Sequence, residues 1–191
     1  DPQITPLVPV LKSPWLMFHV AVIASAYGFF GFGFLLGTAT ISWMAFGKKE
    51  ASVERRIREL TLMNQLSLLT GLALMTIGIF LGAVWANESW GRYWGWDPKE
   101  TWALIVMVAY AVVTHLHLVQ RWNNAWLFNL CSVFAFTTVL MTFLGVNYLL
   151  SGMHSYGHTE GAPRIFGYIL LFYGFVSVLG VVSFRKRRAS F

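Results

Sequence analysis

Charged side chains are scarce in this chain of 191 residues, where Asp, Glu, Lys and Arg together make up 12% of the sequence. An average soluble domain is about 25% charged and about 45–50% apolar. Here 57% of the residues are hydrophobic and 17% are aromatic. A soluble globule could not cover so much apolar surface with so few charges, and disordered chains are poor in aromatic residues. The composition therefore predicts an integral membrane protein.

Cysteine is almost absent, because Cys131 is the only one in the chain. A single thiol cannot form an internal disulfide, a CxxC redox pair or a thiolate metal cluster. Cys131 lies within an apolar run, where a cysteine behaves as a small buried hydrophobic residue. We therefore interpret it as a packing residue, and chemistry must come from other side chains.

Charge is missing altogether from five long segments, namely residues 15–46, 60–86, 101–120, 125–150 and 165–184. Each reaches the roughly 20 residues that a helix needs to cross a hydrocarbon core. None alternates with a period of two residues, so helices are favoured over the strands of a barrel. The sequence predicts an all-α polytopic membrane protein, a single domain over residues 1–191 with five transmembrane helices. Gly33 and Gly37, four residues apart in the first span, suit close helix packing.

The basic residues predict the direction of these spans. Ten of the 14 lie in the loop 47–59, the turn 121–124 and the tail 185–188, which alternation of five spans places on one side. The positive-inside rule makes that side cytoplasmic, with the N-terminus outside and the C-terminus inside. The net charge of +6 is thereby explained without a nucleic-acid partner. The basic tail also suits anionic membrane lipid, although topology alone accounts for it.

Tryptophan is concentrated in and around the outer loop 87–100, with five Trp between residues 85 and 102. Trp85 and Trp102 fit a role as interfacial anchors at the ends of spans. Trp90, Trp94 and Trp96 exceed what a belt needs, and glycines between them allow close approach of a flat ligand. We interpret these three as a platform for a wide aromatic ring such as a porphyrin. The alternative is a purely structural cluster.

The acidic residues of the same loop have a local explanation. Asp97 suits the N-cap of the third span, Pro98 its first position, and Glu100 the reciprocal partner of a capping box. We expect Asp97 to be a capping residue. A catalytic carboxylate is the alternative interpretation.

Three of the five histidines fall on the predicted outer side. His19 lies one helical turn inside the first span, and His154 and His158 lie in the second outer loop, 151–164. Two imidazoles on opposite faces of a haem give bis-histidine iron. An intramembrane histidine such as His19 can instead be a helix–helix hydrogen-bond partner. Spacing alone does not choose between His154 and His158.

The other two histidines lie deep in the third span. His115 is about 14 residues, or ~21 Å, from its outer end, and His117 is expected to point to nearly the opposite helix face. Either His115 is a hydrogen-bonding residue, or it is a ligand whose partner lies on a helix outside this chain. Ionisable groups inside a membrane are functional candidates.

The loop WGRYWGWDPKETWALI, residues 90–105, closely resembles the WWD domain of haem-handling proteins, specifically the CcsA/ResC type of system II cytochrome c biogenesis. The resemblance extends over a histidine-bearing span, the basic loop, the THLH span and the later loop GMHSYGH. It implies that His19 and His154 are axial haem ligands and that His115 is an intramembrane ligand. It also implies that the chain is the C-terminal portion of a CcsA or fused CcsBA protein.

The resemblance further implies an activity and its partners. The family moves haem b, iron protoporphyrin IX, to the outer membrane face and attaches it through thioethers to the CxxCH thiols of apocytochrome c, as a holocytochrome c synthase-type lyase. It works with a CcsB/ResB-type membrane partner and a thiol-reducing protein. The expected location is the bacterial cytoplasmic (inner) membrane with the site on the periplasmic face, or the thylakoid membrane in a plastid or cyanobacterium. Because the chain has one cysteine, it is neither the cytochrome nor the reductant.

The resemblance and the charges together define a candidate site. Its members, in order of expected role, are the axial ligands His19 and His154, the intramembrane ligand His115, the platform Trp90, Tyr93, Trp94, Trp96 and Asp97, the propionate contacts Arg92, Lys99 and Arg164, and the less favoured ligands His117 and His158. Two other functions stay open. One is a haem transporter or chaperone without ligation activity, and the other is a structural membrane subunit.

Overall fold

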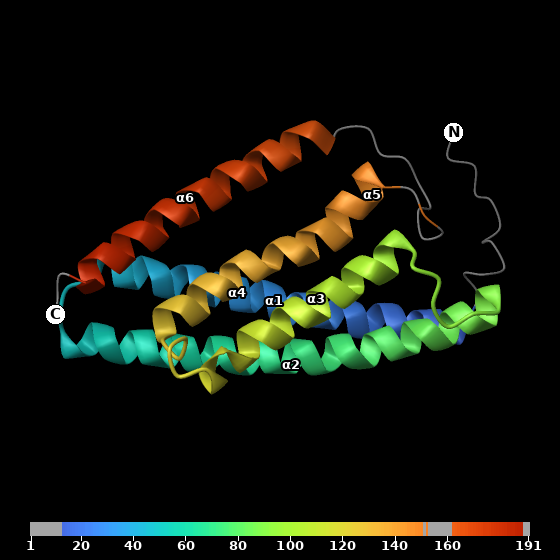
Figure 1. Cartoon of the computed structure of the whole chain (residues 1–191), viewed down its shortest axis with the longest axis horizontal. Helices are drawn as coiled ribbons and strands as arrows, with labels where there is room; N and C mark the ends of the chain where they lie inside the picture. The colour runs from blue at the N-terminus through green and yellow to red at the C-terminus, as the bar shows by residue number, and fades with distance from the viewer. Residues whose placement is uncertain (1–12, 151, 153–161, 189–191) are drawn as a thin grey trace.

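The computed structural model describes residues 13–150, 152 and 162–188, and this part of the chain contains helices and no β-strand (Figure 1). Five helical segments are long and apolar enough to cross a membrane, which confirms the predicted all-α membrane fold. The elements in chain order are α1 (Pro14–Phe46), α2 (Ala51–Trp90), α3 (Pro98–His115), η2 (Leu116–Leu118), α4 (Ala125–Leu140), η3 (Met141–Gly145), α5 (Val146–Leu149) and α6 (Ala162–Arg188).

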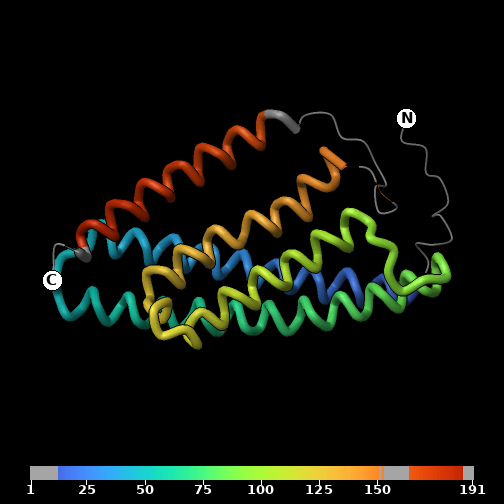
Figure 2. The backbone as a smooth tube through the Cα atoms, viewed as in Figure 1, coloured from blue at the N-terminus to red at the C-terminus, as the bar shows by residue number. Residues whose placement is uncertain are grey.

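Successive long helices run in opposite directions, so the connections gather at two ends (Figure 2). We call the end with residues 47–59, 119–124 and 185–188 the basic end. We call the end with residues 13–19, 85–98 and 152 the tryptophan end. Which side of the membrane each end faces stays a prediction.

Helix α2 differs from the predicted span 60–86 at both ends. It begins at Ala51, because the charged segment before the apolar run is also helical. It ends at Trp90, where Gly91 takes the left-handed conformation (φ 70°) that favours glycine and terminates helices. The loop predicted at 87–100 is therefore shorter and consists of residues 91–97, which we call the tryptophan loop.

The predicted role of Gly33 and Gly37 in close helix packing is confirmed. A Cβ on Gly33 would lie 2.5 Å from Leu68 Cδ2 in α2, and one on Gly37 would lie 2.5 Å from Ser132 Oγ in α4. Two glycines four residues apart thus bring α1 against two different helices. Close backbone approach of this kind supplies the van der Waals contact that holds membrane helices together.

A buried polar cluster joins α2 to α4 beside these glycines. The amide nitrogen of Asn64 donates to Asn129 Oδ1 and Ser132 Oγ, both at 2.9 Å. Asn129 in turn donates to Thr61 Oγ1 at 2.9 Å. Both asparagines are fully buried. Polar side chains that bond across helices in lipid fix the helix register, so this cluster sets how α2 and α4 face each other.

Candidate functional site

The ring of His19 is held by a main-chain carbonyl of the neighbouring helix. His19 Nδ1 lies 2.8 Å from the carbonyl oxygen of Gly78 in α2. Because a carbonyl only accepts, Nδ1 carries a proton, and in the neutral ring Nε2 then carries the lone pair. A neutral imidazole whose other nitrogen donates to a backbone carbonyl is the usual state of a metal-binding histidine.

Glycine makes room for that ring. A Cβ on Gly82 would lie 2.6 Å from His19 Cε1 and 2.8 Å from Nδ1. On the same part of α2, Trp85 stacks parallel to the imidazole, with ring centroids 6.3 Å apart and planes 8° apart. Hydrogen bond, glycine contact and stacked indole together fix the position of the His19 ring.

The start of α1 is itself anchored to the end of α2. Ser13 caps α1, since its hydroxyl oxygen accepts from the main-chain N–H of Trp15 at 3.2 Å. The same hydroxyl donates to Glu88 in the last turn of α2. The first turns of α1, which carry His19, are therefore tied down on a rigid helix, as a binding site requires.

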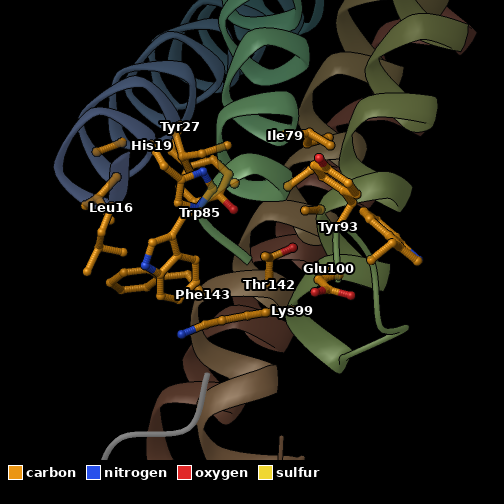
Figure 3. A pocket seen from close by; sticks show the side chains of 17 residues that line it. Leu16, His19, Tyr27, Ile79, Trp85, Tyr93, Lys99, Glu100, Thr142 and Phe143 are labelled. Carbon is orange, nitrogen blue, oxygen red and sulfur yellow. The ribbon is translucent and has the colours of Figure 1, made fainter. Parts of the chain in front are cut away.

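A cavity of about 450 Å³ opens beside His19 (Figure 3). Its volume is within the range of about 300–1,000 Å³ typical of small-molecule sites, which are mostly apolar with a few polar groups. The lining comes from α1, α2, the tryptophan loop, α3 and η3, with these residues: Leu16, His19, Val20, Ile23, Ala24, Tyr27, Ile79, Gly82, Ala83, Trp85, Tyr93, Trp94, Lys99, Glu100, Ala103, Thr142 and Phe143.

One wall of the cavity is formed where α4 leaves regular geometry. Residues Met141–Gly145 form a π-helical turn, a feature often found at functional sites. Thr142 and Phe143 of this turn line the cavity. Thr142 Oγ1 donates to the carbonyl of Thr138 at 2.8 Å, and the side chain lies beside Tyr27 of α1 in the cavity wall. The π turn thus connects α4 to the α1 side of the site.

The predicted capping box at the start of α3 is confirmed. Asp97 is 6% exposed and accepts from the main-chain N–H of Lys99 at 3.1 Å. Glu100 Oε2 accepts from the main-chain N–H of Asp97 at 3.2 Å and of Gly95 at 2.8 Å. The two carboxylates therefore shape the tryptophan loop by holding its backbone.

The aromatic residues of the loop occupy different places. Tyr93 and Trp94 line the cavity. Trp90 lies outside the lining and packs edge-on against Trp85, with centroids 4.8 Å apart. Trp96 is 70% exposed, packs edge-on against Trp94, and has a positive φ of 56°, which is strained for a bulky residue.

Trp85 corrects one expectation from the sequence. It is 1% exposed and lies between His19 and Trp90, so its expected role as an interfacial anchor is wrong. The indole is buried because α2 continues one turn beyond it and brings Trp90 back over it. Trp85 belongs to the wall of the cavity.

The three candidate cations are not equivalent. Lys99 lines the cavity. Arg92 folds over the loop, since a Cβ on Gly95 would lie 2.7 Å from its Cζ. Arg164 is exposed near the start of α6 and is not among the lining residues. Among these three, the structure brings Lys99 to the cavity.

His154 and His158, which were predicted to lie in a second outer loop, lie outside the described residues. The described residue nearest to His154 in sequence is Gly152. A Cβ on Gly152 would lie 2.5 Å from Asp97 Oδ1 and 2.9 Å from Pro98 Cδ. The backbone at Gly152 therefore packs directly on the capping box of the tryptophan loop.

His115 and His117 lie together at the far end of α3. Their ring centroids are 6.3 Å apart and the planes differ by 22°, so the prediction that they point to opposite faces is wrong. The helix ends at His115, and the tighter η2 turn changes the direction of the next residues. Nδ1 of His115 donates to the carbonyl of Ala111 at 2.7 Å, and Nδ1 of His117 to that of Thr114 at 2.9 Å.

Comparison with known proteins assigns this sequence to a family. The model of the family described as cytochrome C assembly protein matches residues 1–154. The chain belongs to this cytochrome c assembly family. The matched residues contain His19, the whole tryptophan loop and both histidines at the end of α3.

Individual relatives of this assembly-family chain come from bacteria and plastid-bearing algae. Protein NrfI of Wolinella succinogenes is 48% identical over 164 residues, which cover 85% of this chain and 18% of that protein. Cytochrome c biogenesis protein CcsA is 38% identical in Guillardia theta, covering 80% of this chain and 57% of that protein. In Chlamydomonas reinhardtii it is 39% identical, covering 81% and 44%. The chain spans less than two thirds of the length of these relatives.

Several residues of the site in this assembly-family chain were not predicted from the sequence, namely Tyr27, Gly78, Gly82, Thr142 and Phe143. A signal for the two glycines was present. Gly78 and Gly82 have the same four-residue spacing as Gly33 and Gly37, and that spacing marks a face where another helix approaches closely. The π turn carries no comparable signal in the sequence.

Proposed function

We propose that the tryptophan end binds haem and that His19 is one of its iron ligands. The observation that carries this proposal is the tautomer and setting of His19. Its Nδ1 donates a hydrogen bond to the Gly78 carbonyl, and its ring borders an apolar, aromatic cavity of about 450 Å³. An Nε2 lone pair beside aromatic walls suits a metalloporphyrin.

His154 is the proposed second axial ligand. Its support is the position of Gly152 against Asp97 and Pro98, at the same end of the molecule as His19. His154 is two positions after Gly152, and two residues of chain span at most ~7 Å. His158 is four residues further along and is the less favoured candidate.

The rest of the cavity supports a haem by shape and charge. Tyr93 and Trp94 offer aromatic surface to the ring. Lys99 is the proposed partner of a haem propionate, because a cation paired with a carboxylate makes a charge-assisted hydrogen bond. Arg92, in the tryptophan loop, is a second candidate, and Trp90 and Trp96 support the wall indirectly through Trp85 and Trp94.

The haem is the cargo and substrate of the proposed reaction. The two cysteine thiols of an apocytochrome c CxxCH motif add across its two vinyl groups. Each addition forms one C–S bond, and the thiol hydrogen goes to the other vinyl carbon, so no external oxidant or reductant is consumed. This chain would contribute orientation: it holds the iron and leaves the vinyl edge accessible.

The wider setting is proposed with the function. The tryptophan end would face the outer side of a bacterial cytoplasmic or thylakoid membrane, because the opposite end carries ten of the 14 basic residues. His115 would ligate haem within the membrane together with an imidazole from a CcsB/ResB-type partner or fused segment. A separate protein would keep the apocytochrome thiols reduced.

An absorption spectrum of the intact purified protein tests the haem site. We expect a Soret band, its loss in His19→Ala and in His154→Ala, and its recovery in both variants on addition of imidazole. His158→Ala is the matched control and should retain haem. A preparation that has no Soret band, or whose band is unchanged in both ligand variants, would refute the site and favour a structural subunit.

A second experiment separates attachment from transport. The intact protein is co-expressed with apocytochrome c in cells that lack their own attachment system. Haem that stays on the apocytochrome through denaturation shows thioether formation. Haem bound by this protein without covalent product would instead indicate a transporter or chaperone.

A further inference from the structure

A second hollow lies at the opposite end of the molecule, between α4 and α6. It is an open groove of about 490 Å³. Aromatic and aliphatic side chains dominate it, with one charged residue at its end. The lining residues are Trp126, Leu130, Phe134, Ser177, Gly180, Val181, Phe184 and Arg185.

Trp126 joins the two helices at the bottom of this groove. Its indole N–H donates to Ser183 Oγ at 2.9 Å and approaches the Gly180 carbonyl at 3.3 Å. Its ring packs against Phe184, with centroids 5.0 Å apart. The contact between α4 and α6 is thus fixed by hydrogen bonds, and the groove is part of the fold.

The two cations at the end of α6 have different surroundings. Lys186 donates to the main-chain carbonyls of Ala45 and Gly47, at 3.2 and 2.5 Å, and so caps the end of α1. Arg185 is exposed and lines the groove. Lys186 therefore stabilises the end of α1, whereas Arg185 lies at the end of the apolar groove.

The groove is lined by two helices that are long and apolar enough to cross a membrane, so its natural surroundings are lipid acyl chains. Its charged end coincides with the basic end of the molecule, and no acidic residue is among its lining. A neighbouring apolar helix would fill the groove but leave the guanidinium unmatched. A lipid with an anionic head fits both features of the site. Its acyl chain fills the apolar groove, and its phosphate pairs with the guanidinium, which binds phosphate through a fork of N–H donors.

We infer that this groove binds an anionic phospholipid from the membrane leaflet at the basic end. One acyl chain lies along α4 and α6 between Phe134 and Val181, and the phosphate lies on Arg185. Basic pockets between transmembrane helices are known to suit such headgroups. This site is independent of the cavity at His19.

The test uses the intact protein in nanodiscs that contain equal amounts of phosphatidylglycerol and phosphatidylcholine, followed by native mass spectrometry of the released protein–lipid complexes. We expect at least ~5-fold more phosphatidylglycerol than phosphatidylcholine retained. Arg185→Gln should reduce the retained phosphatidylglycerol about 5-fold. Arg121→Gln is the matched control, because it removes one exposed charge from the same end, outside the groove.

A groove-filling variant separates a shaped site from a charge effect. Val181→Trp adds bulk within the groove and leaves Arg185 in place, so it should also lower the retained phosphatidylglycerol. Equal loss in the two arginine variants would overturn the inference. So would equal retention of the two lipids, or full retention in Val181→Trp.

Discussion

The imidazole of His19 and the main-chain carbonyl of Gly78 meet at 2.8 Å across the contact between α1 and α2. The acceptor is backbone, so the orientation of the ring depends on how closely the two helices approach. That approach is set by glycines, since Cβ atoms on Gly78 and Gly82 would lie 2.5 Å from Ile23 and 2.6 Å from His19. The orientation of the His19 ring, on which the proposed haem site depends, is therefore a product of helix packing.

Gly82→Ala should disturb the haem site without changing any proposed ligand. The added methyl group would meet the His19 ring at 2.6 Å, so the ring must move and its bond to Gly78 lengthen. Because ligand geometry must be held within about 0.5 Å, we expect at least a 5-fold loss of Soret absorbance per mole of purified protein.

Gly28→Ala is the matched control for that change, since a Cβ there meets nothing within 4 Å. It removes one glycine from a transmembrane helix and leaves the site untouched. If Gly82→Ala retained as much haem as Gly28→Ala, the close contact between His19 and α2 would not contribute to haem binding.

The capping box predicts how Asp97 responds to substitution. Asp97→Ala removes the acceptor for the first turn of α3, and loss of an N-cap costs about 1 kcal/mol. Asparagine is an equally good cap. The free energy of unfolding of Asp97→Asn should therefore be within a few tenths of a kcal/mol of that of the original protein. Thermal unfolding followed by tryptophan fluorescence measures both variants.

The same pair of variants tests the alternative of a catalytic carboxylate. If Asp97 acts only through the backbone, Asp97→Asn should retain haem attachment in the co-expression assay. An Asp97→Asn protein that folds normally but forms no covalent product would show that the negative charge itself is required.

The fold was predictable because its signals are local. Five uncharged runs identify the helices, and Asp97-Pro-Lys-Glu100 identifies the start of α3 through residues within four positions of one another. The bounds of α2 were harder to predict, because the mostly charged segment 54–59 belongs to the helix and hydrophobicity alone cannot detect it.

The site was only partly predictable, because its key contacts join distant residues. His19 and the tryptophan loop were expected to share one end, and they do. No sequence pattern pairs His19 with Gly78, 59 residues away, or places Thr142 of the π turn beside Tyr27. The directions of His115 and His117 were wrongly predicted, because the regular helix was assumed to continue past its actual end.

Lys99 and Arg164 should differ in their effect on haem affinity. Lys99 lines the cavity, whereas Arg164 does not. A hydrogen bond to a charged group contributes about 1.5–3 kcal/mol, so Lys99→Gln should weaken haem binding about 10- to 100-fold. Arg164→Gln should leave it within about 2-fold. Titration of haem into the apoprotein, followed by the Soret band, gives both constants, and an equal loss in the two variants would contradict the assignment.

The Asn64–Asn129 pair gives the last prediction, a coupled loss of stability. Each side chain bonds to the other and to a hydroxyl of a third residue, so each single alanine variant leaves buried polar groups without their partners. We expect Asn64→Ala and Asn129→Ala to destabilise the protein by about 1 kcal/mol each, and the double variant by less than their sum. The coupling should be about 0.6 kcal/mol, the average for interhelical hydrogen bonds in membranes. Reversible unfolding in mixed micelles measures the cycle, with Asn147→Ala as control, because Asn147 Nδ2 donates to the carbonyl of Phe143 one helical turn earlier. Additive effects of Asn64→Ala and Asn129→Ala would mean that the two residues stabilise α2 and α4 separately and do not fix the contact between them.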